Sequence, residues 1–311
     1  MTALRGLWAG WGKALLMALA LLALLHQFVF RWATVANTSM YATLLPGDLL
    51  LLERWPLWTG LERGDVVVFR DPVQDDKAVF RRRLLVKRIA GLPGDIVEIR
   101  NGRLFVNGRA APVPAGSTNG WSVRLKHGHG TDSLMLALGL PKDLALPGAD
   151  LLQLPLNPLL AEQVSRLPMV ASAVQRPIAN GAHEHLFPFS PGRSWNNDDY
   201  GPLAIPAEGT TVDLTPQDLP LYDRLIGRYE HNRMEVVNGQ LLVNGEASGK
   251  YTVQQDYYFV LGDARDASYD SRYWGFVPAD HVVGKAAVIL FNPHVERNNF
   301  TGSRTFRSLP E

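Results

Sequence analysis

The sequence predicts a mostly β protein, an antiparallel and barrel-like sheet with short helices, preceded by one apolar helix at the N-terminus. Three observations predict it. Many short apolar runs are separated by turn signals such as Pro-Gly and Asn-Gly, which is typical of all-β folds. A strand, Asn-Gly turn, strand pattern occurs twice. One long uncharged stretch stands near the beginning of the chain.

The first expected element is a membrane-spanning helix in the apolar stretch 14–30 (ALLMALALLALLHQFVF), which contains no charge. Roughly 17 to 25 such residues cross a bilayer core. Arg5 and Lys13 precede it, which favours a cytoplasmic N-terminus with the remaining chain outside. The alternative is a signal peptide cleaved after 34–36, but its core would be only about 7 to 15 residues long. We therefore expect residues 1–35 to be a cytoplasmic N-terminus and a retained anchor.

Short strands then follow in the part of the chain that comes after the anchor. Their β-branched and apolar runs, bounded by Pro, Gly and Asp, predict strands at 48–55, 66–69, 84–90, 96–100 and 104–106. The last two flank Asn101-Gly102, a strong hairpin signal. The segment 234–245 (MEVVNGQLLVNG) repeats this hairpin pattern, and 257–261 and 282–291 supply the final strands.

Residues 109–232 differ in character, with more Pro, Gly and His and less regular patterning. We interpret them as an inserted second domain, between the two parts of a first domain at 36–108 and 233–311. Within the insertion, a short helix is expected inside 150–167, a strand at 168–174, and a second helix at 216–230 that starts near Thr215 or Asp218.

Composition excludes several classes of function. The 311 residues include 31 basic and 30 acidic ones, so no overall positive field favours nucleic acid as a partner. Cysteine is absent, which excludes disulfides, cysteine nucleophiles and thiolate metal sites. The pairs His127/His129 and His183/His185 lack further ligands at a recognisable spacing, so we expect neither a metal nor another cofactor.

Lys87 is the residue that most suggests chemistry, because it lies in an apolar strand. Alternation places Leu85, Lys87 and Ile89 on one face. Burial among apolar neighbours disfavours the ammonium form and lowers the pKa of the amine. A neutral amine can act as a general base toward a serine hydroxyl, and Ser39 is the candidate. The plain alternative is a lysine that snorkels at a strand edge.

Two further observations bear on this pairing. The segment 262–278 (GDARDASYDSRYWGFVP) is dense in Asp, Arg and Ser, which favours a hydrogen-bonded loop that fixes its neighbours over a solvated surface turn. A Ser-His-Asp triad is disfavoured because no histidine lies within these motifs and no G-x-S-x-G pattern surrounds Ser39.

With these motifs, the chain resembles the bacterial type I signal peptidases (leader peptidases), in a long form with a large inserted second domain. The resemblance rests on Ser39-Met40 with Thr43-Leu44 and Gly47-Asp48, on 63–69 (RGDVVVF), on 86–95 (VKRIAGLPGD) and on the 262–278 loop. It covers roughly 33–108 and 233–292. The stretch 195–202 (WNNDDYGP) resembles part of the inserted domain of long members.

The resemblance implies a Ser-Lys dyad serine protease on the signal-peptidase catalytic fold. Ser39 is then the nucleophile and Lys87 its general base, while the Ser268 hydroxyl orients the lysine. The Ser39 amide and the side chain of Asn37, which replaces the hydroxyl or glycine common at its position, would form the oxyanion hole. The supporting residues implied around this loop are Gly262, Asp263, Asp270 and Arg272, the last two as a salt bridge.

The resemblance also implies the substrate and the location. The substrates would be exported preproteins with Ala-x-Ala cleavage sites, bound as an added strand beside Lys87. The residues implied to line the substrate pockets are Val35, Ala36, Leu44, Leu85 and Val86. We expect a single-pass protein of the bacterial inner (cytoplasmic) membrane, in contact with the lipid bilayer, with its catalytic domain on the periplasmic or extracytoplasmic side.

Two alternatives remain open to test. One is a catalytically silent, membrane-anchored periplasmic binding or assembly module, against which the presence of both Ser39 and Lys87 argues. The other is a regulatory or self-cleaving Ser-Lys protease on the same fold, related to the SOS-type repressors. An N-terminal DNA-binding domain would favour that protease, whereas an apolar segment stands in its place.

Overall fold

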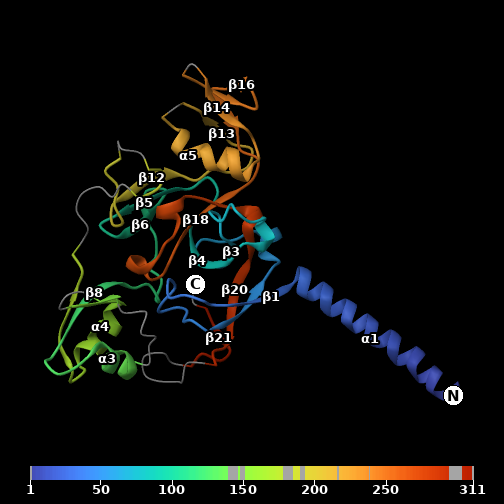
Figure 1. Cartoon of the computed structure of the whole chain (residues 1–311), viewed down its shortest axis with the longest axis horizontal. Coiled ribbons are helices and arrows are strands. Elements are labelled where there is room, and N and C mark those ends of the chain that lie inside the picture. The colour runs from blue at the N-terminus through green and yellow to red at the C-terminus, as the bar shows by residue number, and fades with distance from the viewer. Residues whose placement is uncertain are drawn as a thin grey trace.

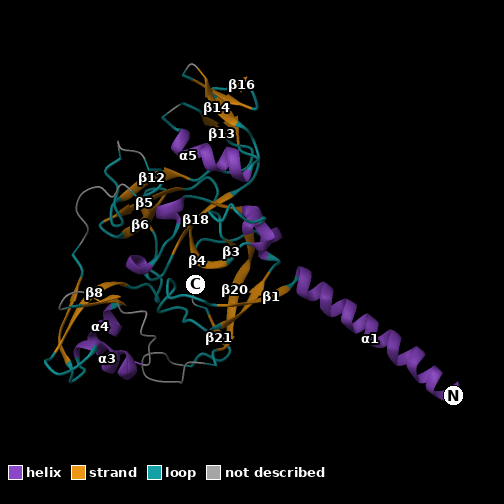
Figure 2. Cartoon of the chain, in the orientation of Figure 1, coloured by secondary structure: helices purple, strands orange, loops and turns teal. Residues whose placement is uncertain are grey.

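In the computed structural model, a body of β-sheets is joined to one projecting helix (Figure 1). The structure describes residues 2–138, 146–147, 151–177, 185–189, 193–215, 217–237, 239–293 and 303–309. The helix α1 (Thr2–Phe28) leaves the body beside β1 and extends away from it. Strands dominate the rest, with a few short helices between them (Figure 2). The predicted fold class, mostly antiparallel β with short helices after an apolar N-terminal helix, is confirmed.

The main sheet runs in the order β1-β2-β20-β3-β4-β18-β19, with β21 added beside β20. All of its pairs are antiparallel. Its strands are β1 (Phe30–Thr34), β2 (Leu49–Glu53), β3 (Val66–Arg70), β4 (Leu84–Gly91), β18 (Tyr257–Leu261), β19 (Val277–Pro278), β20 (Val282–Phe291) and β21 (Arg307–Ser308). The strand β4 lies between β3 and β18, so both of its edges are paired.

Both faces of the sheet are buried at β3. Val66 and Val68 of β3 belong to one apolar cluster, with Met40, Leu44 and Val86. The intervening Val67 and Phe69 belong to another, with Ile89 and Trp274. Because both faces meet apolar partners, all four residues of Val66–Phe69 are apolar. Successive side chains still point to opposite faces, and they therefore pack alternately into the two clusters.

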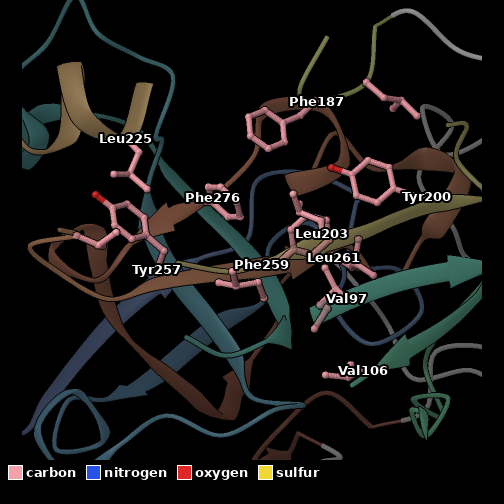
Figure 3. Packing of buried hydrophobic residues seen from close by; sticks show 14 of the residues in the cluster. Val97, Val106, Phe187, Tyr200, Leu203, Leu225, Tyr257, Phe259, Leu261 and Phe276 are labelled. Carbon is pink, nitrogen blue, oxygen red and sulfur yellow. The ribbon is translucent and has the colours of Figure 1, made fainter. Parts of the chain in front are cut away.

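A second sheet, β12-β5-β6-β7, packs over the largest core (Figure 3). Its strands are β5 (Ile96–Arg100), β6 (Arg103–Val106), β7 (Arg109–Ala110) and β12 (Tyr200–Ala204). The predicted hairpin turn is present, with Asn101 at φ 48° and Gly102 at φ 74°, the left-handed conformations that this turn type requires. The core joins Val97 and Leu203 of this sheet to Phe259 of the main sheet.

The third sheet, β11-β8-β10-β9, lies within the predicted insertion and carries two helices. Its elements are β8 (Asn119–Leu125), α3 (Thr131–Leu138), β9 (Leu146–Pro147), β10 (Leu152–Leu156), α4 (Pro158–Ser165) and β11 (Val170–Gln175). The helix α4 begins with Pro158 after an Asn157 cap, whose side chain accepts from Leu160 N at 2.8 Å. Its apolar cluster includes Tyr41, Leu45 and Ala264, so this sheet packs directly on the segments that flank Ser39 and Ser268.

The remaining elements lie at the end of the body away from the third sheet, at the top of Figure 1. They are β13 (Thr211–Asp213) paired with β17 (Lys250–Thr252), the hairpin β14 (Met234–Val237) and β15 (Gln240–Val243) with β16 (Glu246–Ala247), and α5 (Leu219–Asp223) followed by a π-helical turn, Arg224–Tyr229. Short helices elsewhere are α2 (Pro56–Thr59), α6 (Ser271–Trp274) and the 3-10 turns Val79–Arg81, Arg265–Ala267 and Ala279–His281. The second predicted hairpin is confirmed, although Asn238 lies outside the described residues.

The structure corrects the predicted end of the N-terminal helix. The apolar stretch was expected to remain helical through Phe30, but α1 ends at Phe28 and Phe30 begins β1. The reason is tertiary, because Phe30–Thr34 pairs along the whole of β2. Among the described helices, the segment Trp11–Phe28 alone is long and apolar enough to cross a membrane.

Within 109–232 the expected elements are present but incomplete. The helix and strand expected inside 150–174 are α4 and β11, and the helix expected at 216–230 is α5 with its π-helical turn. The strands β8 and β10 and the helix α3 were not predicted. Pro155 in the middle of β10 conceals that strand, because proline is normally confined to strand edges. The boundaries 109 and 232 stay a prediction, since β12 pairs with β5 outside them.

Candidate active site

Lys87 lies in the middle of β4 and is buried, with 2% of its surface exposed. Its strand neighbours alternate as expected: Leu85 and Ile89 belong to the cluster on one face, and Val86 to the cluster on the other. Opposite Lys87, the paired residue of β3 is Val67. The ammonium group is therefore held inside a paired, apolar strand, where its position is fixed by the sheet.

Ser39 meets this amine from the connection between β1 and β2. Lys87 Nζ hydrogen-bonds to Ser39 Oγ. The next residue, Met40, is fully buried and fixes the connection in the core, and Leu44 N donates to Met40 O at 2.8 Å. Ser39 Oγ in turn donates to Asn37 Oδ1 at 2.9 Å. The hydroxyl and the amine thus form the direct pair that a Ser-Lys dyad requires.

The 262–274 segment forms the third side of the site and is held by buried ion pairs. Arg272 donates to both carboxylate oxygens of Asp270 at 2.9 Å, and both side chains are almost fully buried. Arg88 donates to both oxygens of Asp263, at 2.9 and 2.8 Å. Thr43 Oγ1 also donates to Asp263. Bidentate pairs of this kind fix orientation as well as distance.

Gly262 is the point where the loop and the nucleophile segment come closest. A Cβ built on Gly262 would lie 2.1 Å from Ser268 Oγ and 2.6 Å from the carbonyl oxygen of Ser39. No side chain fits at those distances. The neighbouring Ala264 N donates to the same Ser39 carbonyl at 3.1 Å. Glycine at this position therefore allows the loop to lie directly against Ser39.

Burial sets the protonation of the amine. It lowers the pKa of Lys87 from 10.5 to about 8, partly offset by Asp270, which favours the charged form. Arg272 lowers the pKa of Lys87 further, and Asp263 raises it. Burial alone would raise the pKa of Asp270, but the guanidinium of Arg272 holds that pKa below its usual range. With this pKa, about a tenth of Lys87 is neutral at pH 7 and about half at pH 8, and the neutral amine can accept a proton.

A pocket of about 250 Å³ opens beside the dyad. Ser39 and Lys87 lie in its wall, together with the apolar side chains of Leu85 and Trp274. The pocket is lined by Asn37, Thr38, Ser39, Asp71, Val73, Arg83, Leu85, Lys87, Ala267, Tyr269 and Trp274. A buried nucleophile that faces an open pocket of this size can reach the backbone of a bound chain.

The residues predicted to line the substrate pockets are placed differently from one another. Leu85 lies in the wall of this pocket. Val35, Leu44 and Val86 are buried in one apolar cluster with Met40, the residue after Ser39, and Ala36 is exposed. Their roles in substrate binding stay predictions.

The predicted roles of Asn37 and Ser268 also stay predictions. Asn37 presents its side-chain oxygen to Ser39, and the Ser39 amide donates to it at 3.3 Å. The proposed oxyanion donor is the side-chain nitrogen of Asn37, Nδ2, and not the oxygen that bonds to Ser39. Ser268 Oγ is buried and has no hydrogen-bond partner among the described residues, so it retains the capacity to bond a rearranged Lys87 or a ligand.

Several contributors to the site were not recognised from the sequence. Asp71 and Arg83 lie in the pocket wall and form an ion pair of 2.5 Å. Thr43 and Arg88, quoted only as parts of motifs, hold Asp263. The sequence offered one signal for Asp71, since a charged residue directly after an apolar strand such as β3 can lie at the edge of a pocket.

No metal site was found among the described residues. They contain no group of three His, Asp or Glu side chains that could hold a metal ion. His127 and His129 are exposed in the turn after β8. His183 and Glu184 lie outside the described residues.

Comparison with known proteins gives one family model and several relatives. The model for "Signal peptidase, peptidase S26" matches residues 8–134 and 208–291. The chain is 36% identical over 110 residues to a signal peptidase I of Bacillus amyloliquefaciens, which is 35% of this chain and 53% of that protein. It is 54% identical over 46 residues to a signal peptidase I of Aquifex aeolicus, covering 15% and 18% of the two chains.

These matches span about half or less of the curated relatives' length. A crystal structure of a signal peptidase I from Enterococcus faecalis V583 aligns over 73% of this chain and 96% of that one, at 18% identity. Its TM-score is 0.26, too low an overlap to carry an argument. The segment 135–207, which holds most of the third sheet, is not matched by the family model.

Proposed function

The chain belongs to the signal peptidase family, peptidase S26, and on this premise we propose that it is a membrane-anchored serine endopeptidase that removes signal peptides from exported preproteins. One observation carries the proposal most directly, the hydrogen bond between Lys87 Nζ and Ser39 Oγ at the wall of an open pocket. A buried amine of lowered pKa beside a serine hydroxyl is the arrangement of a Ser-Lys hydrolase.

The reaction begins when the Ser39 hydroxyl turns from Asn37 Oδ1 toward neutral Lys87, which takes its proton. The oxygen attacks the carbonyl carbon of the residue before the cut. The resulting oxyanion is stabilised by the Ser39 amide, which must leave Asn37 Oδ1, with Asn37 Nδ2 as the second proposed donor. Collapse of this intermediate leaves an ester on Ser39. The departing amine, which becomes the new N-terminus of the mature protein, takes its proton from Lys87.

The second half of the reaction returns the enzyme to its starting state. Lys87, neutral again, removes a proton from a water molecule, which attacks the ester carbonyl. The bond from the carbonyl carbon to Ser39 Oγ breaks, and Oγ takes the proton back from Lys87. The signal peptide leaves with a new carboxylic acid at its C-terminus, which loses its proton to solvent and becomes a carboxylate.

The position of the anchor supports a substrate that is itself in the membrane. The helix α1 ends at Phe28, and Ser39 follows it after a single strand (Figure 1). With Arg5 and Lys13 on the cytoplasmic side, the catalytic sheets would lie on the extracytoplasmic side of the inner membrane. The dyad would then act close to the outer end of a signal peptide that still spans the bilayer.

The experiment that tests this function is cleavage of a model preprotein with an Ala-x-Ala site by the detergent-solubilised full chain. We expect cutting after the second alanine by the wild type and none by Ser39→Ala or Lys87→Ala. An inactive wild type, or variants of undiminished activity, would exclude the peptidase and favour a membrane-anchored binding module.

A further inference from the structure

The third sheet contacts the loop that carries Ser268, which is residues 262–270 between β18 and α6. Hydrogen bonds made by Thr118, Gly120 and Arg176 join the two, and they fall on Asp263–Asp266, just before Ser268. They come from the start of β8 and from the residue that follows β11. These elements belong to the predicted insertion, 109–232. The Ser-Lys chemistry by itself assigns this insertion no role in the site.

Thr118 makes the first set of contacts and is completely buried. Its backbone N donates to Asp263 O at 2.8 Å, and its carbonyl accepts from Arg265 N at 3.0 Å. Its side-chain Oγ1 donates to the carbonyl of Tyr41 at 3.0 Å. A single residue thus ties the Ser268 loop to the segment two residues after the nucleophile.

Asp266 is the target of the second set. Its carboxylate accepts from Gly120 N at 2.6 Å and from Arg176 Nη2 at 2.6 Å. The same guanidinium nitrogen lies 3.0 Å from a carboxylate oxygen of Asp198. Arg176 therefore joins the Ser268 loop to the stretch 195–202, and the carbonyl of Asn197 in that stretch accepts from Arg272 Nη1 at 3.3 Å.

We propose that the third sheet is a clamp that orders the Ser268 loop against Ser39, with Thr118 and Arg176 as positioning residues for catalysis. The inference rests on the proposed function, because it assigns the clamp a role in the same Ser-Lys reaction. Arg176 and Asp198 lie in the segment that the family model does not match, whereas Thr118 lies within a matched range.

The physical reason is that the loop has little structure of its own. Between β18 and α6 its only regular element is a single 3-10 turn, Arg265–Ala267, and this turn has no side-chain cap. Asp263 and Ala264, at the start of the loop, contact Arg88 and the Ser39 carbonyl. Release of Asp266 would let this segment move, and a misplacement of about 1 Å can cost about 100-fold in rate.

Loosening the loop would also change the surroundings of Lys87. The charged groups that face its amine are Asp270, Arg272 and Asp263. Burial is what keeps the pKa of Lys87 low. Water that enters beside a displaced loop would relieve that burial and raise the pKa of Lys87. The pH above which the enzyme becomes active would then move upward, so this shift reports that the loop has moved.

The test uses the full chain in detergent and compares Thr118→Val and Arg176→Met with Thr118→Ser, which keeps the hydroxyl. Arg166→Met serves as the control, since Arg166 is exposed and, within the described residues, forms its ion pair with exposed Glu162 on α4. We expect kcat to fall about tenfold to 100-fold in the first two variants, with KM within about twofold. The acidic limb of their kcat/KM profiles should shift toward higher pH. Thr118→Ser should recover most of the rate, and Arg166→Met should match the wild type.

Hydrogen exchange provides a readout that does not need catalysis. The amides of Ala264 and Arg265, which donate to Ser39 and Thr118, should exchange faster in Thr118→Val and Arg176→Met while the amides of β4 keep their protection. Unchanged exchange, or rate losses with no shift of the pH limb, would overturn the clamp. If the wild type cleaves no preprotein, the proposed function fails, but the exchange data still decide whether the sheet orders the loop.

Discussion

Two sides of the active site are built by different means. Lys87 is carried by β4, which is hydrogen-bonded along both edges to β3 and β18. Ser268 is carried by a loop whose position depends on buried ion pairs and on contacts from the third sheet. The sheet distributes its stability over many backbone bonds, whereas the loop depends on a few side chains. Substitutions on the strand side should therefore change chemistry, and those on the loop side should change geometry and stability as well.

The largest effect is expected on the strand side, from Lys87→Met. Loss of the base should lower kcat/KM by about 10⁴-fold, the size seen when one member of a hydrolytic triad is disabled. Stability at pH 7 should not fall, because methionine fills the site without a buried ammonium group. Activity assays and urea unfolding of both proteins measure the two outcomes.

The pH dependence of stability sharpens this prediction. The folded pKa of Lys87 is near 8, below the value of 10.5 in the unfolded chain, so between these values the unfolded state binds more protons. The wild type should therefore gain about 3 kcal/mol over Lys87→Met as the pH rises from 8 to 10.5. A variant that is much less stable than the wild type at pH 7 would contradict a costly buried amine.

On the loop side, Asp270→Asn should have the largest effect on stability. It leaves the buried guanidinium of Arg272 without its counter-charge, which typically costs about 3 to 5 kcal/mol of unfolding free energy. The pKa of Asp270 is held below its usual range, so its contribution is complete above that range and is lost as the pH falls through the lowered value. Urea unfolding at pH 7 measures the loss.

The matched control for Asp270→Asn is Glu162→Gln, which breaks the exposed pair with Arg166. Exposed pairs contribute little because water and salt screen them. Its urea midpoint should therefore equal that of the wild type. Equal losses in the two variants would mean that the loop pair is no more important than a surface one.

Gly262→Ala should separate the two sides of the site. The added methyl group would meet Ser268 Oγ and the Ser39 carbonyl at distances no side chain tolerates, so the loop must move away. We expect kcat to fall about 100-fold through this misplacement, with about 1 to 3 kcal/mol lost in stability. Gly130→Ala is the control, because nothing lies within 4 Å of a Cβ at Gly130. An active Gly262→Ala enzyme would argue that close contact between loop and nucleophile is unnecessary.

The smallest effect is expected from Leu85→Ala, which widens the pocket without touching the dyad. A difference of one or two methylenes in an apolar pocket changes the ratio of kcat/KM between two substrates by about tenfold. The preference of Leu85→Ala among the residues before the cut should change by about this factor. Leu84→Ala, the neighbouring residue outside the pocket wall, should keep the wild-type preference. Competition between preproteins that differ only at the residues before the cut measures both variants.

The same difference between strand and loop decides what could be predicted from the sequence. The burial of Lys87 followed from local alternation, because Leu85 and Ile89 in the same strand determine its surroundings. The Asp270–Arg272 salt bridge was implied by the resemblance to the signal peptidases, which rests in part on the short motif that contains both residues. Such features depend on residues close together in the sequence, and the structure bears out both the strand and the ion pair.

The contacts that hold the loop could not be predicted in this way. Thr118 and Arg176 are far from Ser268 in sequence and meet its loop only because the third sheet packs on Tyr41, Leu45 and Ala264. Nothing in the local pattern around Thr118 or Arg176 indicates that packing. Tertiary pairing likewise ended the N-terminal helix at Phe28, where hydrophobicity alone favoured its continuation.

The pH profile of kcat/KM for the wild-type enzyme tests the central claim, that Lys87 is a buried general base for Ser39, most directly. Rates should rise with pH through a single ionisation near 8 and then level off, because the neutral amine is the active form. A limb near 6.5, the usual value of histidine, or rates that continue to climb to about 10.4, the usual value of lysine, would contradict it.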